Sequence, residues 1–411
     1  MSKNRKNSPS KAASSKAAPS TLVKSLAAQA GVPSAPTNVS SVATAPTPVA
    51  PPAPTQGANE QTSKAGDLSF IYSRQFPNWL AQNNVSLAFT TYHANRIFFI
   101  GLSPKGELSM SAQNFPRCMG LWASNDAQTL YMSHLFQILR FESMQDINAT
   151  KKGIDRMYVP RHAYTTGDCD IHDIAANGKG LPVFVNTLYS CLATASQRYS
   201  FEPIWKPKFI SKLAPEDRCH LNGLAIVDGQ PRYVTCVAKS DVSDGWRDHR
   251  STGGMVIDIT TDDEVAGGMA MPHSPRFYNG RLYVHNSGHG QFGYVDLKSG
   301  KFEPIAFCPG YLRGMSFIGD FAVVGMSLSR NNINFAGLPL DAALKAHNAE
   351  ARCGIQIIDL NTGNIVNGLR LGGAVQELYD VVTLANTRNP MALNFNKSDL
   401  PRMLNPPPPR T

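Results

Sequence analysis

Six short stretches of similar pattern recur through the chain and constrain its fold more strongly than any other feature. Each opens with a charged or imidazole side chain, reaches an apolar residue four positions later and continues as a strand-like segment. The opening residues are Arg117, Asp170, His220, His273, Arg313 and Glu377. A repeat of about fifty residues with several short strands is typical of a β-propeller. We therefore expect six innermost strands whose opening residues gather at one axial mouth.

Turn signals separate further strand-like segments within the repeats. The apolar segments 254–259, 292–297 and 354–360 each lead into a short polar turn. Short apolar segments joined by such turns indicate antiparallel meanders. Each repeat is therefore expected to form one blade.

The two ends of the repeat array are each incomplete. The last repeat has an inner strand at 378–384 without a clear continuation, whereas the first ordered strands, at 85–102, have no inner strand before them. We infer that the N-terminal strands complete the last blade, because this closes the ring and removes free sheet edges. The expected fold is an all-β, six-bladed β-propeller.

Composition divides the chain into three parts. Residues 1–67 are rich in Ala, Ser, Pro and Lys and have little to bury, which predicts a disordered tail. Residues 68–395 carry the propeller pattern, and residues 396–411 form a Pro-rich C-terminal tail. The formal net charge is +9, but most of the excess lies in the N-terminal tail, so nothing indicates nucleic-acid binding by the folded part.

Cysteine usage and hydropathy bear on location. The seven cysteines form no CxxC pair and are odd in number, which favours a reducing cytoplasm. No stretch approaches the roughly 18 apolar residues of a membrane span. We expect a cytoplasmic monomer that binds no membrane, while an organelle transit function of the basic tail is left open.

The expected ring of opening residues can be interpreted first as a metal centre. His220 and His273 come from neighbouring blades, and Asp170 or Glu377 would add a carboxylate. Imidazole and carboxylate ligands together suit one divalent ion, namely Zn²⁺, Fe²⁺ or Mn²⁺.

Two interpretations without a metal are also open. Arg117 and Arg313 could bind a carboxylate or phosphate of a small ligand, because guanidinium groups pair with such anions in bidentate fashion. Alternatively, these arginines could neutralise Asp170 and Glu377 in a closed ion-pair network, with the histidines only forming hydrogen bonds.

Three further side chains extend the predicted site. Asn222 and Tyr379 lie beside the opening residues and are candidate ligand-binding groups. If the segment from Asp170 is a strand, His172 shares a face with Asp170. The carboxylate could then orient the imidazole as a general base.

A long loop at 240–254 is expected on the same face and contains Trp246 and Arg247. An aromatic ring beside an arginine could stack on a sugar or another planar ligand. The loop could equally be an Ω-loop whose tryptophan pins it to the domain.

Three stretches carry a resemblance to a known family: HLNG at 220–223, MPHSPR at 271–276 and GYLRGM at 310–315. With them the chain resembles an uncharacterised, conserved-hypothetical bacterial family with a domain of unknown function. The resemblance covers roughly residues 68–393. It implies no established activity.

The expected architecture is also similar to six-bladed propellers of the gluconolactonase and regucalcin type. That similarity implies a calcium ion held by Glu, Asn and Asp oxygens at the axial mouth. Only Glu377, Asn222 and Asp170 could supply such oxygens here, and the flanking histidines and arginines depart from the pattern. Calcium is therefore less expected than Zn²⁺, Fe²⁺ or Mn²⁺.

The sequence thus predicts a polar axial site for a small anionic or hydroxylated ligand. One expected function is a metal-dependent hydrolase or lyase that uses a metal-activated water. Its catalytic residues would be His172, His220, His273 and Asp170. The alternative is a non-catalytic recognition module that binds a peptide or glycan of a partner.

Overall fold

The computed structural model describes residues 68–144, 153–328, 337–396, 398 and 400–404. The predicted disordered tail, residues 1–67, lies outside the described residues, as does part of the Pro-rich end. Within the described ranges no helix is long and apolar enough to cross a membrane. The cytoplasmic location and the monomeric state stay predictions.

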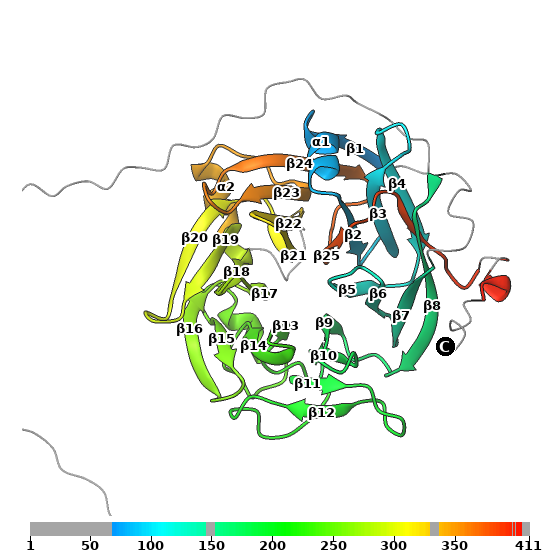
Figure 1. Ribbon diagram of the computed structural model, residues 1–411. Helices are drawn as coiled ribbons and strands as arrows, with labels where there is room; N and C mark the ends of the chain where they lie inside the picture. Colours follow the sequence, from blue (N-terminus) through cyan, green and yellow to red (C-terminus); the bar gives the residue numbers. More distant parts are fainter. Residues whose placement is uncertain (1–67, 145–152, 329–336, 397, 399, 405–411) are drawn as a thin grey trace, which may run out of the picture. The chain divides into compact units, whose positions relative to one another are not determined.

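The described strands form six mainly antiparallel sheets around a common axis (Figure 1), which we call blades 1 to 6. Blade 1 consists of β5 (Cys118–Ala123), β6 (Thr129–His134), β7 (Gln137–Met144) and β8 (Arg156–Thr165). Blade 2 consists of β9 (Ile171–Ala176), β10 (Pro182–Asn186), β11 (Cys191–Thr194) and β12 (Glu202–Trp205). Blade 3 consists of β13 (Leu221–Val227), β14 (Gln230–Cys236), β15 (Gly254–Asp258) and β16 (Asp263–Met269).

The remaining three blades repeat the same meander. Blade 4 consists of β17 (Pro272–Tyr278), β18 (Arg281–Asn286), β19 (Gln291–Asp296) and β20 (Lys301–Phe307). Blade 5 consists of β21 (Tyr311–Ile318), β22 (Phe321–Ser327), β23 (Cys353–Asp359) and β24 (Ile365–Gly373). Blade 6 consists of β25 (Val381–Ala385), β2 (Val85–Thr91), β3 (Arg96–Leu102) and β4 (Leu108–Asn114). The prediction of an all-β, six-bladed β-propeller is confirmed.

Blade 6 joins two segments that are far apart in sequence. Its inner strand β25 pairs antiparallel with β2, in the register Val85–Ala385 to Phe89–Val381. β2 in turn pairs with β3, where Phe89 stacks on Phe98 at 4.9 Å. The predicted closure of the last blade by N-terminal strands is therefore confirmed.

Two further strands cover outer edges. β1 (Leu68–Tyr72) pairs antiparallel with β24 of blade 5, and β26 (Pro390–Ala392) pairs in parallel with β8 of blade 1. An outer edge strand exposes unpaired backbone groups. These additional strands satisfy those groups in the two blades that flank the closure.

Apolar side chains fill the spaces between neighbouring blades. One cluster combines Leu87 and Phe98 of blade 6 with Val323 and Ile355 of blade 5. All six residues of β9, including His172 and Asp173, are buried, because an inner strand is packed on both faces. The blades are thus held by continuous lateral packing.

Short helices lie in the connections. They are α1 (Phe76–Gln82), α2 (Leu340–Ala346), η2 (Gly245–His249), η3 (Ser287–His289) and η4 (Leu400–Arg402). α1 begins with a proline in its first turn, where the missing N–H costs nothing. It buries Phe76, Trp79 and Leu80, and Trp79 contacts Phe321 of blade 5 edge-on at 5.7 Å.

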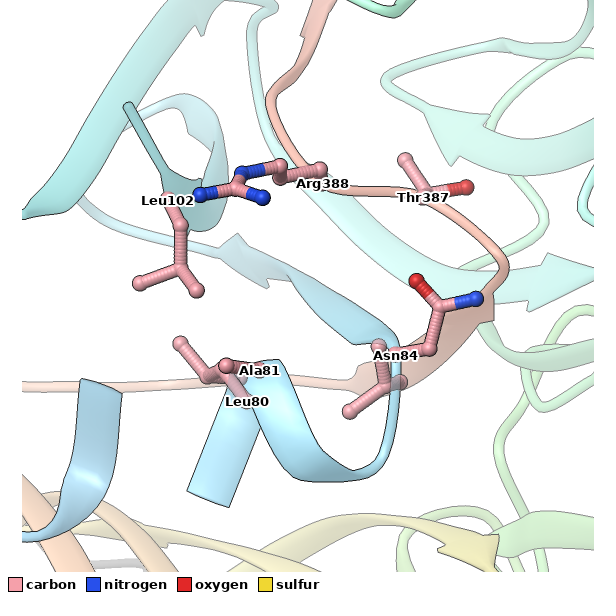
Figure 2. A pocket seen from close by; sticks show the side chains of 7 residues that line it. Leu80, Ala81, Asn84, Leu102, Thr387 and Arg388 are labelled. Carbon is pink, nitrogen blue, oxygen red and sulfur yellow. The ribbon is translucent and has the colours of Figure 1, made fainter. Parts of the chain in front are cut away.

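A small cavity marks the seam of blade 6 (Figure 2), between α1 and the segment that follows β25. Leu80, Asn84, Leu102 and Arg388 are among its lining residues. The backbone N–H of Leu102 donates to the carbonyl of Arg388 at 2.6 Å, which fastens the seam. A volume of about 60 Å³ has room for only a water or two, so this cavity is no ligand site.

Candidate functional site

Recurrent hydrogen bonds show which residues of the inner strands are equivalent. In four cases a Ser or Thr hydroxyl of the preceding blade donates to one carbonyl near the start of the inner strand. These carbonyls belong to Ile171, Leu221, Leu312 and Leu378. In blades 1 to 4 the residue before the inner strand has a left-handed φ between 45° and 50°. These residues are Arg117, Asp170, His220 and Met271.

Both criteria define two rings of side chains at the axial mouth. The outer ring comprises one residue from each blade, which either has the left-handed φ or directly precedes the residue with the bonded carbonyl. These residues are Arg117, Asp170, His220, Met271, Tyr311 and Glu377. The inner ring lies two residues further along each strand: Met119, His172, Asn222, His273, Arg313 and Tyr379.

The six predicted opening residues all lie at the axial mouth, but they occupy two levels. His273 and Arg313 lie one level deeper, because the outer positions of blades 4 and 5 are filled by Met271 and Tyr311. The deeper level instead brings them together with His172 and other side chains of the inner ring. Nδ1 of His172 and Nδ1 of His273 confirm the equivalence, since each bonds the carbonyl two residues before it.

The inner ring combines burial with unused hydrogen-bonding capacity. Five of its six side chains are polar, and those residues are only 2 to 8% exposed. Within the described part of the chain, four of their atoms lack a hydrogen-bond partner: Asn222 Nδ2, His273 Nε2, Arg313 Nε and Tyr379 OH. Each such buried atom lowers the free energy of unfolding by about 1–3 kcal/mol. Four of them at equivalent positions leave hydrogen bonds available at the axial mouth for a ligand or for water.

Hydrogen bonds define the tautomers of the two inner-ring histidines. Nδ1 of His273 lies 2.9 Å from the Met271 carbonyl, and Nδ1 of His172 lies 2.9 Å from the Asp170 carbonyl. A carbonyl only accepts, so each Nδ1 carries a hydrogen and each Nε2 is an acceptor.

Burial keeps the imidazoles of His172 and His273 neutral. Burial, together with His220 and Arg313, lowers the pKa of His172 to about 4, although Asp170 opposes the shift. Burial and the Arg313 guanidinium lower the pKa of His273 well below its usual value. Both side chains therefore offer an unprotonated Nε2 at neutral pH.

Arg313 supplies positive charge to the inner ring. Its guanidinium carbon lies 4.5 Å from the centre of the Tyr379 ring, and its Nη1 lies 3.8 Å from Oε1 of Glu377. His93, from the turn after β2, approaches the other Glu377 oxygen at 3.7 Å. Burial raises the pKa of Tyr379 well above its usual value, so its hydroxyl keeps its hydrogen.

His220 is oriented by a carboxylate that the sequence did not single out. Asp217 Oδ2 accepts from Nδ1 of His220 and from the Trp246 indole N–H, both at 2.9 Å. The Trp246 ring stacks on His220 at 4.1 Å, and the His172 ring meets His220 edge-on at 4.7 Å. Burial opposes ionisation of Asp217, but His220, His172 and Trp246 outweigh it and lower its pKa.

The loop with Trp246 agrees in part with the alternative in which the tryptophan pins the loop to the domain. The indole is 2% exposed and is covered by the Arg247 guanidinium at 4.4 Å. Trp246 therefore pins η2 onto His220 rather than offering a free face for stacking. A ligand contact by Arg247 stays a prediction.

The ion pairs differ in part from the predicted closed network. Arg313 does pair with Glu377, but Arg117 pairs with Asp168 instead of Asp170. Asp170 accompanies His172 at 3.6 Å, as predicted. The φ of Asp170 is 50°, which places this residue in a turn rather than in the strand. The contact between Asp170 and His172 therefore arises from the turn.

A buried ionic cluster forms the floor beneath the inner ring. Arg276 of blade 4 reaches Asp173 of blade 2 at 2.7 Å and Asp380 of blade 6 at 3.6 Å. Each carboxylate also accepts two backbone N–H groups at 2.9 Å. The donors are Ile174 and Leu224 for Asp173, and Val381 and Leu121 for Asp380. The cluster thus ties alternate blades together across the axis.

No group of three or more His, Cys, Asp or Glu side chains in the described ranges could hold a metal ion. His220, His273, Asp170 and Glu377 instead have the separate partners given above. A divalent metal at this mouth stays a prediction.

Sequence reasoning missed several members of the site. Asp217 lies in a turn three residues before His220, and its φ of 41° lets its side chain fold back. Thr187 contacts His172 Nδ1 at 2.9 Å, and Tyr311 contacts His273 Nδ1 at 3.3 Å. The short acidic turn before His220 was the one local signal for Asp217.

Replacing Asp217 with alanine is expected to lower the free energy of unfolding by about 1–3 kcal/mol, because two buried N–H donors lose their acceptor. Asp217→Asn keeps an acceptor oxygen and should lower it by less. Urea unfolding followed by tryptophan fluorescence measures both. Equal stability of Asp217→Ala and the parent chain would contradict this account of the contact.

The comparison with protein families identifies the family to which this chain belongs. Residues 74–393 match the family described as "Domain of unknown function (DUF4915)". The match covers most of the chain, so the protein belongs to this family. The resemblance inferred from the sequence is therefore confirmed, whereas a specific similarity to gluconolactonases is not.

Curated proteins and solved structures add no function. No curated protein matches this chain. A chain in the "Crystal structure of Nidogen/Laminin Complex" is similar with a TM-score of 0.46 and 10% identity, covering 74% of this chain and 99% of that one. A protein of unknown function from Bacteroides caccae is similar with a TM-score of 0.42 and 10% identity, covering 73% and 98%.

Proposed function

We propose that the axial mouth binds a small anionic or hydroxylated molecule through the inner ring. The observation that carries the proposal is the set of four buried, unpartnered polar atoms at equivalent positions of neighbouring strands. A ligand that pairs with them would recover the desolvation free energy that they lose in the free protein.

The chemistry of the ring favours one class of ligand. Arg313 and the amide of Asn222 donate hydrogen bonds, which suits a carboxylate or phosphate oxygen. The neutral Nε2 atoms of His172 and His273 accept, which suits hydroxyl hydrogens. Half-buried Asp170 and exposed Asp168 at the rim would disfavour a ligand with high negative charge.

A second candidate function is a hydrolase or lyase that uses this bound ligand as substrate. The observation that favours it is the Asp217–His220 contact, because a carboxylate on Nδ1 leaves Nε2 free to take a proton. A recognition module for a peptide or glycan would have no need of such a pair.

A metal ion in the site is a further proposal. Histidines that bind metals donate their other ring N–H to a carbonyl or carboxylate, as His172 and His273 do here. Elemental analysis of the purified chain tests it. Stoichiometric Zn, Fe or Mn that disappears in His273→Ala would support a metal, whereas a metal-free parent chain would exclude it.

Thermal unfolding with D-gluconate, citrate and glycerol 3-phosphate tests the binding proposal. At least one probe should raise the melting temperature by about 3 °C or more near saturation. Arg313→Ala should abolish this shift, because it removes the charge of the inner ring.

Arg232→Ala is the matched control. Arg232 also lies over a tyrosine ring, at 5.4 Å from Tyr233, and pairs with a carboxylate, Asp258, but it lies outside both rings. Its loss should leave the ligand-induced shift unchanged. The proposal fails if no probe stabilises the chain or if the shift survives in Arg313→Ala.

A further inference from the structure

A hollow at the outer edge of blade 6 has a chemistry different from that of the axial mouth. Its volume is about 350 Å³, and it is lined by Ala112, Gln113, Asn114, Asn394 and Asn396. The first three end strand β4, and the two asparagines follow β26. This volume lies in the range of about 300–1,000 Å³ that is usual for small-ligand sites.

The lining of this hollow is neutral and rich in carboxamides. Four of its five residues carry a side-chain amide, and none of the five carries a charge. Each amide presents two N–H donors and one carbonyl acceptor. Such a set complements groups that donate and accept at the same position, as the hydroxyl groups of a sugar do, rather than an anion.

Contacts within the protein leave amide donors available. Asn114 accepts from Arg96 Nε at 3.1 Å, and Asn394 accepts from the Asn396 backbone N–H at 3.2 Å. Both bonds use the carbonyl oxygen and leave the NH₂ group. Gln113 and Asn394 line the hollow but are only 9% and 8% exposed, so packing holds both side chains in place.

An exposed aromatic residue stands between two of the lining asparagines in the sequence. Phe395 lies between the two lining asparagines in sequence and is 53% exposed. It is held edge-on against buried Phe115 at 6.4 Å. The exposed part of the Phe395 ring provides a surface for the apolar C–H face of a sugar ring.

We propose that this hollow binds an uncharged saccharide. The carboxamides of Gln113, Asn114 and Asn394 bind its hydroxyl groups, and Phe395 packs against one face of a sugar ring. No residue of the outer or inner ring takes part, so the inference goes beyond the ligand proposed for the axial mouth.

Saturation-transfer NMR on the full chain tests the proposal with maltotriose, cellotriose, xylotriose and tri-N-acetylchitotriose as probes. At least one probe should receive saturation from the protein. Phe395→Ala should weaken its binding by about tenfold and Gln113→Ala by a similar factor, because each removes one contact type. Melting temperatures of both variants check that the blades remain folded.

Two controls separate this site from other surfaces. Phe136→Ala removes an aromatic ring that is 43% exposed in another loop, and Arg313→Ala disables the axial mouth. Both should leave saccharide binding unchanged. The proposal is overturned if none of the four probes binds, if binding survives both hollow substitutions, or if Arg313→Ala abolishes it, since the sugar would then occupy the axial mouth.

Discussion

A chain that begins at Arg96 is expected to lose cooperative unfolding altogether. Its missing strand β2 lies between β25 and β3, so its removal leaves the inner strand of blade 6 without a neighbour in its own sheet. The deletion also removes Leu87 and Phe89, which are fully buried, and opens the ring. The net stability of a domain is only about 5–15 kcal/mol, less than such a loss.

Circular dichroism melting curves and size-exclusion chromatography measure this outcome. The control chain begins at residue 68, retains every described strand and should keep a sharp transition. Phe89→Ala gives a graded version, with an expected loss of about 3–5 kcal/mol. A soluble, cooperatively folded monomer that lacks residues 68–95 would show that closure by β2 is dispensable.

The closure was predictable because it rests on local pattern and on two incomplete ends. The residues of segments 85–102 and 378–384 themselves predict strands. The first segment lacks an inner strand and the second lacks outer strands, so each supplies what the other needs. The meander of blades follows in the same way, since its turns are encoded within a few residues.

The depth of the site residues was not predictable by the same reasoning. The first charged residue of the repeat lies in the outer ring in blade 3 but in the inner ring in blade 4, where Met271 precedes His273. Inner strands also contain β-bulges, for example between Cys118 and Leu121, and a bulge shifts later side chains by one residue. The sequence pattern of a charged residue and an apolar residue four positions later does not show whether the charged residue lies in the outer or the inner ring.

The partners of Asp217 and Arg276 could not be predicted for different reasons. Asp217 reaches His220 only through a turn with left-handed φ, and Arg276 meets Asp173 and Asp380 only once the ring has closed. Sequence separation within these pairs ranges from three residues to about one hundred. The partners of Arg276 follow from the assembled ring, whereas the Asp217–His220 contact depends on the conformation of one turn.

Replacing Arg276 with methionine is expected to lower the free energy of unfolding by about 3–5 kcal/mol, because it leaves two buried carboxylates without their cation. Asp173 and Asp380 are each 3% exposed, and Arg276 makes a two-nitrogen contact with Asp173 at 2.7 and 3.1 Å. Urea unfolding at pH 8 measures the loss. Arg232→Met, which removes a partly exposed pair with Asp258, is the matched control and should lower it by less than about 1 kcal/mol.

The loss in Arg276→Met should also depend on pH. Burial, opposed by Arg276 and reinforced by Asp173, raises the pKa of Asp380 to about 7, whereas an unfolded aspartate has a pKa of about 3.9. The folded state therefore binds this proton more tightly, and the stability that it contributes is present below about pH 4 and is lost as the pH rises through 7. Arg276 favours the ionised form of Asp380, so its removal should destabilise the protein more at pH 8 than at pH 5.5.

Adding Asp380→Asn to Arg276→Met separates charge from packing in this cluster. The double variant cannot ionise at position 380, so the difference between its stabilities at pH 5.5 and pH 8 should shrink relative to that of Arg276→Met alone. Asp173 retains its two backbone donors in both variants and serves as the constant background. Equal losses at the two pH values in Arg276→Met would mean that Asp380 does not take up a proton in this range, and the role of Arg276 would then be packing across the axis alone.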